Sequence, residues 1–426
     1  MFEKRKTNPI AVAVAMGATL MAGCTSATTS VSTESAATAT PVKVAMNGTP
    51  TAAPGVKPGG GNGSNPPPLA ALGPVPVPPD NPNTPEKVEL GKMLFFEPAV
   101  GGDTSTPCSA CHDPDQGWGW AEDISRGYPG TVHWRNSQTV VNSAYYPRIF
   151  WAGSVSSLEA QAKSAASGAV AGNAEFDLVE ARLALMPEYR KRFNEVFGDE
   201  FPLYRNAFRA IAAFERAELV QRDAPIDNYF NGDKSALSEE QLRGMELFNG
   251  KANCIQCHNG PMATDFSFHN IGVPPLKRWE EDGLAQITFR YELYAKGSSE
   301  KLYKEAKADP GYYYRGKNKW DLGKFRTPSL RYTMYSAPYM HNGALNTLEE
   351  VVDFYNRGGM DEEGRTTGYP QTKSKLIKPL GLTDEEKEDL LAFLEAFSGD
   401  EIEIERPVMP DYAPLFTKAE LMMEKK

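Results

Sequence analysis

The sequence predicts a mainly α-helical protein made of two related units, which follow an export signal and a low-complexity segment. Apolar residues recur at helical spacing in several segments, and runs with the alternation of strands are few. A Gly-x-x-Leu-Phe motif occurs twice, in GKMLFF (91–96) and GMELFN (244–249). Helices are expected at residues 85–96, 156–166, 177–198, 203–222, 237–248, 347–357 and 383–397.

Residues 1–23 have the pattern of a secretory signal peptide. Three basic residues at positions 4–6 precede an apolar run that ends at Gly23 and is too short for a membrane span. The run ends in LMAGC, which resembles a bacterial lipoprotein cleavage site with Cys24 as the lipidated residue. Cleavage slightly further on would leave a soluble periplasmic protein instead. The sequence therefore predicts a periplasmic protein that contacts the membrane only through a lipid anchor.

Residues 24–80 are rich in Ala, Thr, Ser, Pro and Gly, and they are expected to form a flexible tether. The full chain has 45 Lys and Arg against 55 Asp and Glu, a formal charge of −10. Loss of residues 1–23 removes three basic residues and one acidic residue, which makes the charge −12. An acidic chain without a basic run argues against nucleic acid as a partner and leaves room for a basic redox partner.

Four of the five cysteines form two C-x-x-C-H motifs, which comprise Cys108, Cys111 and His112, and Cys254, Cys257 and His258. A disulfide, a thioredoxin-like redox pair or half of a zinc site would explain one cysteine pair, but not the repeated histidine. Two thiols three residues apart can add to the two vinyl groups of one haem, and the adjacent histidine then becomes an axial ligand of the iron. The sequence therefore predicts two covalently bound haem c groups.

The two haem motifs lie 146 positions apart and divide the mature chain into two expected domains. These are an N-terminal cytochrome c-like domain (81–235) and a C-terminal one (236–426). Each is expected to be mostly helical and to surround its own haem.

Tyr355 lies in a predicted amphipathic helix near the C-terminus. Thr347 and Glu350 form a capping box at its start, with the pattern Thr-x-x-Glu. The apolar residues of the helix and Tyr355 recur at i, i+3, i+4 and i+7, so Tyr355 points inward. From these residues alone, Tyr355 is a core tyrosine.

Further segments resemble the bacterial di-haem cytochrome c peroxidase family, specifically its MauG-like branch. They are LGPVPVPPDNP, RNSQTVVNSAYYPRIFWAG, FSFHNIG, FRTPSLR, APYMHNG and TLEEVVDFYNRGG, and with the haem motifs they extend over about residues 72–397. The resemblance implies that hydrogen peroxide reacts at the haem on His112, whose distal side is open. The haem on His258 would be closed and would exchange electrons.

The resemblance also gives Tyr355 a second interpretation, as the distal ligand of the haem on His258. In ordinary family members a methionine follows the histidine of the PY-H-G motif by fourteen positions, and fourteen positions after His341 stands Tyr355. A methionine thioether raises the potential of haem iron. A phenolate is hard and anionic, so it should favour oxidised iron instead.

Peroxide cleavage needs a group that moves a proton between the two oxygens and polar partners for the leaving water. The resemblance assigns these roles to Glu175 and Gln161, and it assigns electron relay between the haems to Trp151. The stretch from Gln161 to Glu175 is four residues longer than in the family, so Asp177 and Glu180 are alternatives to Glu175. The family pattern is also altered at Ala152, Ser154 and Ala169, where a local ion pair and a proline are missing.

The resemblance further implies a calcium ion between the haems, held by Asn136 and by the backbone carbonyls of Ser336 and Pro338. His133 lies near the position of a displaceable histidine in peroxidases that need reductive activation, but its register favours a structural or propionate-contacting role. Residues 289–320 are rich in Tyr and Lys. They form either a solvated surface excursion, a partner-docking surface or a route of oxidisable side chains.

Three functions are compatible with these features. The first is MauG-like oxidation of a tryptophan or tyrosine on a partner protein by hydrogen peroxide, with oxidising equivalents shared between the haems through Trp151. The second is conventional cytochrome c peroxidase activity, with electrons from a small cytochrome or cupredoxin. The third is a non-catalytic di-haem electron carrier or redox sensor with both irons closed.

Overall fold

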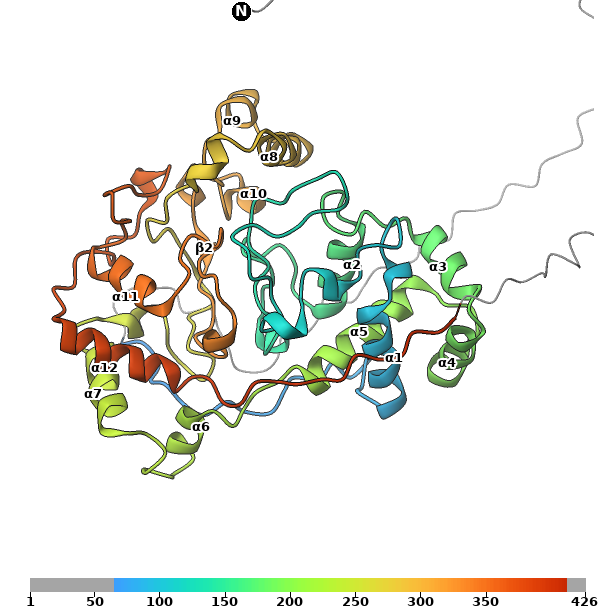
Figure 1. Cartoon of the computed structure of the whole chain (residues 1–426), viewed down its shortest axis with the longest axis horizontal. Helices are drawn as coiled ribbons and strands as arrows, with labels where there is room; N and C mark the ends of the chain where they lie inside the picture. Colours follow the sequence, from blue (N-terminus) through green and yellow to red (C-terminus); the bar gives the residue numbers. More distant parts are fainter. Residues whose placement is uncertain (1–64, 412–426) are drawn as a thin grey trace, which may run out of the picture. The chain divides into compact units, whose positions relative to one another are not determined.

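The computed structural model describes residues 65–411 (Figure 1). The predicted signal peptide (1–23), Cys24 and the predicted tether up to residue 64 lie outside the described residues. Between residues 65 and 411 the protein is mainly helical, which confirms the predicted fold class: there are twelve α-helices and one antiparallel pair of short strands, β1 (Phe268–His269) and β2 (Phe325–Arg326). No helix in this range combines the length and apolarity needed to cross a bilayer.

The helices are α1 (Pro85–Phe96), α2 (Leu158–Ser167), α3 (Phe176–Ala184), α4 (Pro187–Phe197), α5 (Tyr204–Glu218), α6 (Pro225–Phe230), α7 (Glu239–Asn249), α8 (Gly283–Ala295), α9 (Glu300–Glu305), α10 (Tyr313–Gly316), α11 (Leu348–Asn356) and α12 (Asp384–Glu395). The prediction of one helix over 177–198 is wrong, because this segment forms α3 and α4. Pro187 begins α4, and proline is favoured in the first turn of a helix but interrupts a helix interior. The sequence did not predict α6, α8, α9 or α10.

Two helix pairs, α1 with α5 and α7 with α12, cross at the glycines of the repeated Gly-x-x-Leu-Phe motif. A Cβ atom on Gly91 would lie 1.9 Å from the carbonyl oxygen of Ala210, and one on Gly244 would lie 2.0 Å from the carbonyl oxygen of Asp389. Only glycine allows backbones to approach this closely. The sequence repeat therefore corresponds to the same helix crossing in both halves of the chain.

Each helix pair lies in its own hydrophobic core, and the phenylalanine of the repeated motif is central to both. Phe95 packs on Phe214 with ring centroids 5.5 Å apart, and Phe248 packs on Phe393 with centroids 5.3 Å apart. These four side chains are almost fully buried. Each haem motif thus packs against its own hydrophobic core, through Cys108 in the first and Cys254 in the second.

Each end of the described chain packs against the core of the opposite half: Leu69 against the second core and Ile402 against the first. Leu69, in the segment predicted as tether, is buried in the core of α7 and α12, and the N–H of Leu72 donates to Asp227 at 2.7 Å. At the other end, the segment after α12 returns along α5 and α1 (Figure 1). There Ile402 packs on the first core, and its carbonyl accepts a hydrogen bond from Trp118 Nε1 at 3.0 Å. The chain is therefore already packed at Leu69, twelve positions before the predicted domain start at residue 81.

Candidate functional site

The histidines of the two C-x-x-C-H motifs are held in the same way. The Nδ1 atom of His112 lies 3.3 Å from the carbonyl oxygen of Trp118, and Nδ1 of His258 lies 3.1 Å from that of Ala263. A neutral histidine that donates through Nδ1 presents Nε2 as a metal ligand. Both imidazoles are thus oriented with Nδ1 towards a backbone carbonyl, which leaves Nε2 to bind iron.

No disulfide joins the four cysteines of these motifs. Burial is the main cause that raises the pKa of Cys108 and of Cys254 to about 12. Each motif therefore offers two thiols and one imidazole within a single turn of chain. This donor set fits one haem c per motif, with the cysteines forming the thioether bonds and the histidine binding the iron.

An apolar cavity lies beside the second motif, and we call it the haem cavity. Its wall includes Cys254, Cys257 and His258 of the motif, Leu348, Val351, Val352 and Tyr355 of α11, and Trp151, Asn136, Ser336, Pro338, Phe325, Arg326 and His341 from other segments. The face of α11 predicted from helical spacing is thus the face that lines the cavity. Haem is a large, flat and mostly apolar group, so the composition of this wall suits it.

The start of α11 differs from the prediction in one bond. The Thr347 hydroxyl accepts a hydrogen bond from the N–H of Glu350 at 3.2 Å, as predicted. The Glu350 carboxylate, however, accepts from the N–H of Asn346, one residue before the helix cap. The reciprocal half of the predicted capping box is therefore wrong, although the helix begins where it was expected.

Tyr355 lies in the haem cavity together with His258. Burial, followed by the charges of Cys257 and Cys254, raises the pKa of the Tyr355 phenol above its ordinary value. The phenol is therefore neutral unless a cation lies against its oxygen, and a ferric ion would lower this pKa. Besides the imidazole nitrogen of His258, the cavity thus contains an oxygen donor, the Tyr355 phenol, for an iron bound there.

Arg326 is a feature of the haem cavity that the sequence analysis did not identify. Its side chain is 1% exposed, its guanidinium lies 3.7 Å from the ring of Tyr146, and it donates to Gln138 and to the carbonyl of Phe150. Within residues 65–411, none of its hydrogen-bond partners is a carboxylate. A buried cation without a carboxylate partner is suited to bind a haem propionate. The available signal was its position in FRTPSLR, one of the segments that carry the family resemblance.

The structure brings the predicted relay tryptophan and the predicted calcium ligands together. Trp151 is 9% exposed, and its Nε1 donates to the carbonyl of Asn136 at 3.0 Å. The N–H of Asn136 in turn donates to the carbonyl of His341 at 2.9 Å. Ser336 and Pro338 line the same cavity as Trp151. The indole is therefore fixed by the segment that carries the predicted calcium ligand Asn136.

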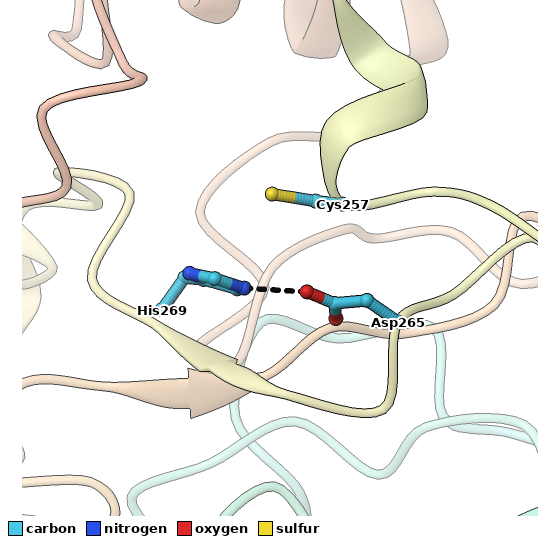
Figure 2. A group of neighbouring side chains, drawn as sticks. All are labelled: Cys257, Asp265 and His269. Carbon is cyan, nitrogen blue, oxygen red and sulfur yellow. Dashed lines mark hydrogen bonds and ion pairs between the residues drawn. The ribbon is translucent and has the colours of Figure 1, made fainter. Parts of the chain in front are cut away.

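A second cluster at this cavity comprises Cys257, Asp265 and His269 (Figure 2). Nε2 of His269 lies 2.7 Å from the Asp265 carboxylate. Burial lowers the pKa of His269, but the hydrogen bonds that its imidazole donates to Asp265 and Cys257 outweigh burial and raise this pKa to about 10. The three donors resemble a metal site. Because Cys257 is needed for haem attachment, only two donors remain, and the cluster belongs to the surroundings of the haem.

The predicted distal residues lie on α2 and at the start of α3. Gln161 is half-buried on α2, whereas Glu175 precedes α3 and is exposed. The alternative Asp177 is also exposed. Glu180 accepts a hydrogen bond from the N–H of Tyr204 at 2.7 Å, which ties it to the start of α5.

His133 is part of a packed aromatic layer. Its ring stacks on Trp134 with centroids 4.3 Å apart, and its Nδ1 accepts a hydrogen bond from the N–H of Arg135. Burial, followed by the charge of Arg135, lowers the pKa of His133 to about 4. These contacts favour the structural role expected from its register.

Glu215 is a buried acid that the sequence analysis missed, and it lies near the first haem motif. It is 4% exposed on α5, and the Ser143 hydroxyl donates to it at 3.2 Å. The adjacent Arg216 pairs with Glu159 instead, at 2.8 Å. Burial raises the pKa of Glu215 to about 7, and Glu215 contributes to the raised pKa of Cys108. A glutamate on the apolar face of an amphipathic helix was the available signal.

Substitution Glu215→Gln is expected to remove a pH dependence of stability. Below about pH 4.5 the carboxyl is protonated in both the folded and the unfolded chain, so burial carries no penalty from a charged group. As the pH rises to about 7, the unfolded chain releases its proton first, and the wild type loses up to about 3 kcal/mol of unfolding free energy. Urea unfolding at about pH 5 and pH 8 measures this loss, with the exposed Glu218→Gln as control. An equal pH dependence in wild type and Glu215→Gln would contradict the prediction.

Comparisons with known proteins agree with these features. Residues 85–235 match the family described as di-haem cytochrome c peroxidase. The chain is 53% identical over 352 residues to the cytochrome-c peroxidase IdrP1 of Pseudomonas sp. (strain SCT), an alignment that covers 82% of this chain and 91% of the relative. It is 34% identical to the methylamine utilization protein MauG of Methylorubrum extorquens, over 79% of this chain and 85% of that one. A solved structure of a MauG-like protein associated with microbial copper homeostasis is similar with a TM-score of 0.65 and 29% identity, over 78% of this chain and 95% of that one.

The relatives confirm the resemblance, and with it the mainly α-helical fold and two covalently bound haem c groups. A family of peroxidases also implies hydrogen peroxide as substrate and a redox or protein partner. The chain belongs to the di-haem cytochrome c peroxidase family and is a haem-dependent oxidoreductase that acts on hydrogen peroxide.

Proposed function

We propose that this protein reduces hydrogen peroxide to water with electrons from a small cytochrome or cupredoxin, and that peroxide reacts at the haem on His112. Each turnover consumes two electrons and two protons and yields two waters. The observation that carries the proposal is the haem cavity, where His258, the ligand expected for the electron-receiving haem, lines the same wall as Trp151. The 53% identity to a protein named cytochrome-c peroxidase, compared with 34% to MauG, favours this function.

The residues around the haems have separate roles in this proposal. When bound, the haems supply the iron that is oxidised and reduced. His112 and His258 orient this iron through imidazoles that backbone carbonyls hold in place. Trp151, whose indole is fixed by its bond to the carbonyl of Asn136, relays electrons between the two haems in this proposal. Gln161 provides polar contacts for peroxide, and the exposed Glu175 takes up protons from water.

Two further features belong to the same proposal. A calcium ion would bind through Asn136 and the carbonyls of Ser336 and Pro338, which line the cavity beside Trp151; oxygen donors are what calcium prefers. The leader sequence and the LMAGC segment support a periplasmic location with a lipid anchor on Cys24.

A second candidate function is MauG-like oxidation of a tryptophan or tyrosine on a partner protein. Tyr355 favours it, because a phenolate ligand would stabilise oxidised iron at the second site. The position of Trp151 at the same cavity favours sharing of oxidising equivalents between the two haems.

Addition of stoichiometric hydrogen peroxide to the purified diferric protein tests these functions. We expect an immediate change in the Soret bands of both haems, because Tyr355 stabilises the oxidised state without prior reduction. Rapid turnover with a reduced small cytochrome would then support the peroxidase, and slow turnover would favour the MauG-like oxidase. No reaction before half-reduction would contradict the role of Tyr355. A ferric spectrum with only low-spin iron, unchanged by peroxide, would indicate an electron carrier and overturn both enzymatic functions.

A further inference from the structure

Helix α8 is apolar on two opposite faces. Its inner face carries Ala285, Phe289 and Leu293, which are fully buried. Its outer face comprises Leu284, Ile287, Tyr291 and Tyr294, at i, i+3, i+7 and i+10, and these side chains are 43%, 68%, 52% and 65% exposed. Helices α8 and α9 lie at the edge of the described chain (Figure 1). Four large apolar side chains on one exposed helix face are typical of an interaction surface.

The segment around this outer face has the opposite charge to the rest of the protein. Residues 283–320 contain eight Lys and Arg and four Asp and Glu, a formal charge of +4, whereas the whole chain carries −10 and the remainder therefore −14. All eight cations are exposed. One of the acids, Asp309, pairs with Arg135 in the interior. We call the exposed cations of residues 283–320 the basic rim of this face, although Lys296 and Lys304 also pair with Glu292 and Glu300. The net positive charge of this segment attracts an acidic partner.

The inner face of α8 connects this surface to the haem cavity. The Phe289 ring lies 5.9 Å from that of Trp134, and the Arg135 guanidinium lies 5.8 Å from Trp134 and 5.7 Å from Phe325. Phe325 stacks on His341 with centroids 3.6 Å apart, and both line the haem cavity. Contiguous packed side chains therefore lead from α8 to the haem cavity beside His258.

We propose that the outer face of α8 and its basic rim form the docking site for an acidic, single-centre electron-transfer protein. The inference rests on the proposed peroxidase function and adds its partner. This partner is acidic because residues 283–320 carry a charge of +4, and it differs from the basic partner that the net charge of the whole chain suggested. The donor gives up one electron per encounter, so two encounters balance the reduction of one hydrogen peroxide with two protons to two waters. A packed route from α8 to the haem cavity would help an electron donor bound at α8 to reduce the second haem. A membrane surface or a second copy of the chain bound there would not need such a route.

The test compares two electron donors, a reduced acidic monohaem cytochrome c and the basic mitochondrial cytochrome c, in peroxide-dependent oxidation by the holoprotein. The small-molecule donor ABTS serves as the reference. We expect the acidic cytochrome to give the higher kcat/KM, which falls as salt is added. The charge-reversal variant K301E/K304E and the apolar variant I287S/Y291S/Y294S should each lower the ratio of the acidic-cytochrome rate to the ABTS rate at least tenfold. The exposed pair L178S/F201S, which lies outside this segment, is the matched control.

Three results would overturn the docking proposal, and a fourth would refute the peroxidase function on which it rests. An unchanged ratio in the α8 variants, or an equal fall in the control, would show that the donor docks elsewhere. Salt-sensitive binding of the wild type to vesicles of anionic phospholipid, lost in the variants, would make the face a membrane contact. A dimer in analytical ultracentrifugation that the variants abolish would make it a self-interface. Absence of activity with ABTS in the wild type would instead refute the proposed peroxidase function.

Discussion

Replacement of Tyr355 by methionine is expected to raise the midpoint potential of the haem on His258 by a few tenths of a volt, on the order of the range that axial ligands control. A thioether stabilises ferrous iron, whereas a phenolate stabilises ferric iron. The diferric protein should then react with stoichiometric peroxide at least tenfold more slowly, because the second haem gives up an electron less readily. Spectroelectrochemical titration and stopped-flow absorption measure the two effects.

Two tyrosine-to-phenylalanine variants separate ligation from packing. Y355F keeps the ring in the haem cavity but removes the oxygen, so it should change the ferric spectrum of one haem. Tyr339 lines the same cavity, but its hydroxyl donates to the carbonyl of Thr333 at 2.8 Å. Y339F should therefore leave both potentials unchanged. If Tyr355→Met and Y355F leave the spectra and potentials as in the wild type, Tyr355 only packs in the core.

Substitution Arg331→Met is expected to lower the free energy of unfolding by about 3–5 kcal/mol. Arg331 and Asp227 form a bidentate pair at 2.6 and 2.8 Å, and both side chains are 1% exposed. Asp227 also accepts the N–H of Leu72, so the pair fastens the start of the described chain onto the second core. Loss of the guanidinium leaves a buried carboxylate without its counter-ion. Denaturant unfolding of the holoprotein, followed by far-UV circular dichroism, measures the change.

The control for this prediction is an exposed ion pair. Lys191 and Glu195 are paired at 3.9 Å with side chains 66% and 52% exposed, so K191M should cost less than about 0.5 kcal/mol. The double variant R331M/D227L should recover part of the stability, because it removes both charges together. A decrease of less than about 1 kcal/mol in the free energy of unfolding of R331M would show that the pair does not stabilise the fold.

The sequence predicts features set by local spacing, such as the haem motifs and the inward face of α11. It does not predict features set by tertiary burial. Glu215 lies on the apolar face of a predicted helix and Arg326 in a family motif, but only the packing of distant segments shows that both are isolated from solvent. Helix α8 was missed because apolar residues on two faces weaken the periodic contrast on which helix prediction depends. Pro187, by contrast, carried the signal that divides the predicted helix 177–198.

The glycine crossings limit how the two halves of this chain can diverge. Between α1 and α5 and between α7 and α12, even the methyl group of an alanine would overlap a backbone carbonyl. Each half of the chain therefore has one position at which replacement of glycine by alanine, the smallest chiral residue, forces two helices apart. Ligands, acids and surface insertions can change independently in each copy. Neither half can lose this crossing without disturbing the core that packs against its haem motif.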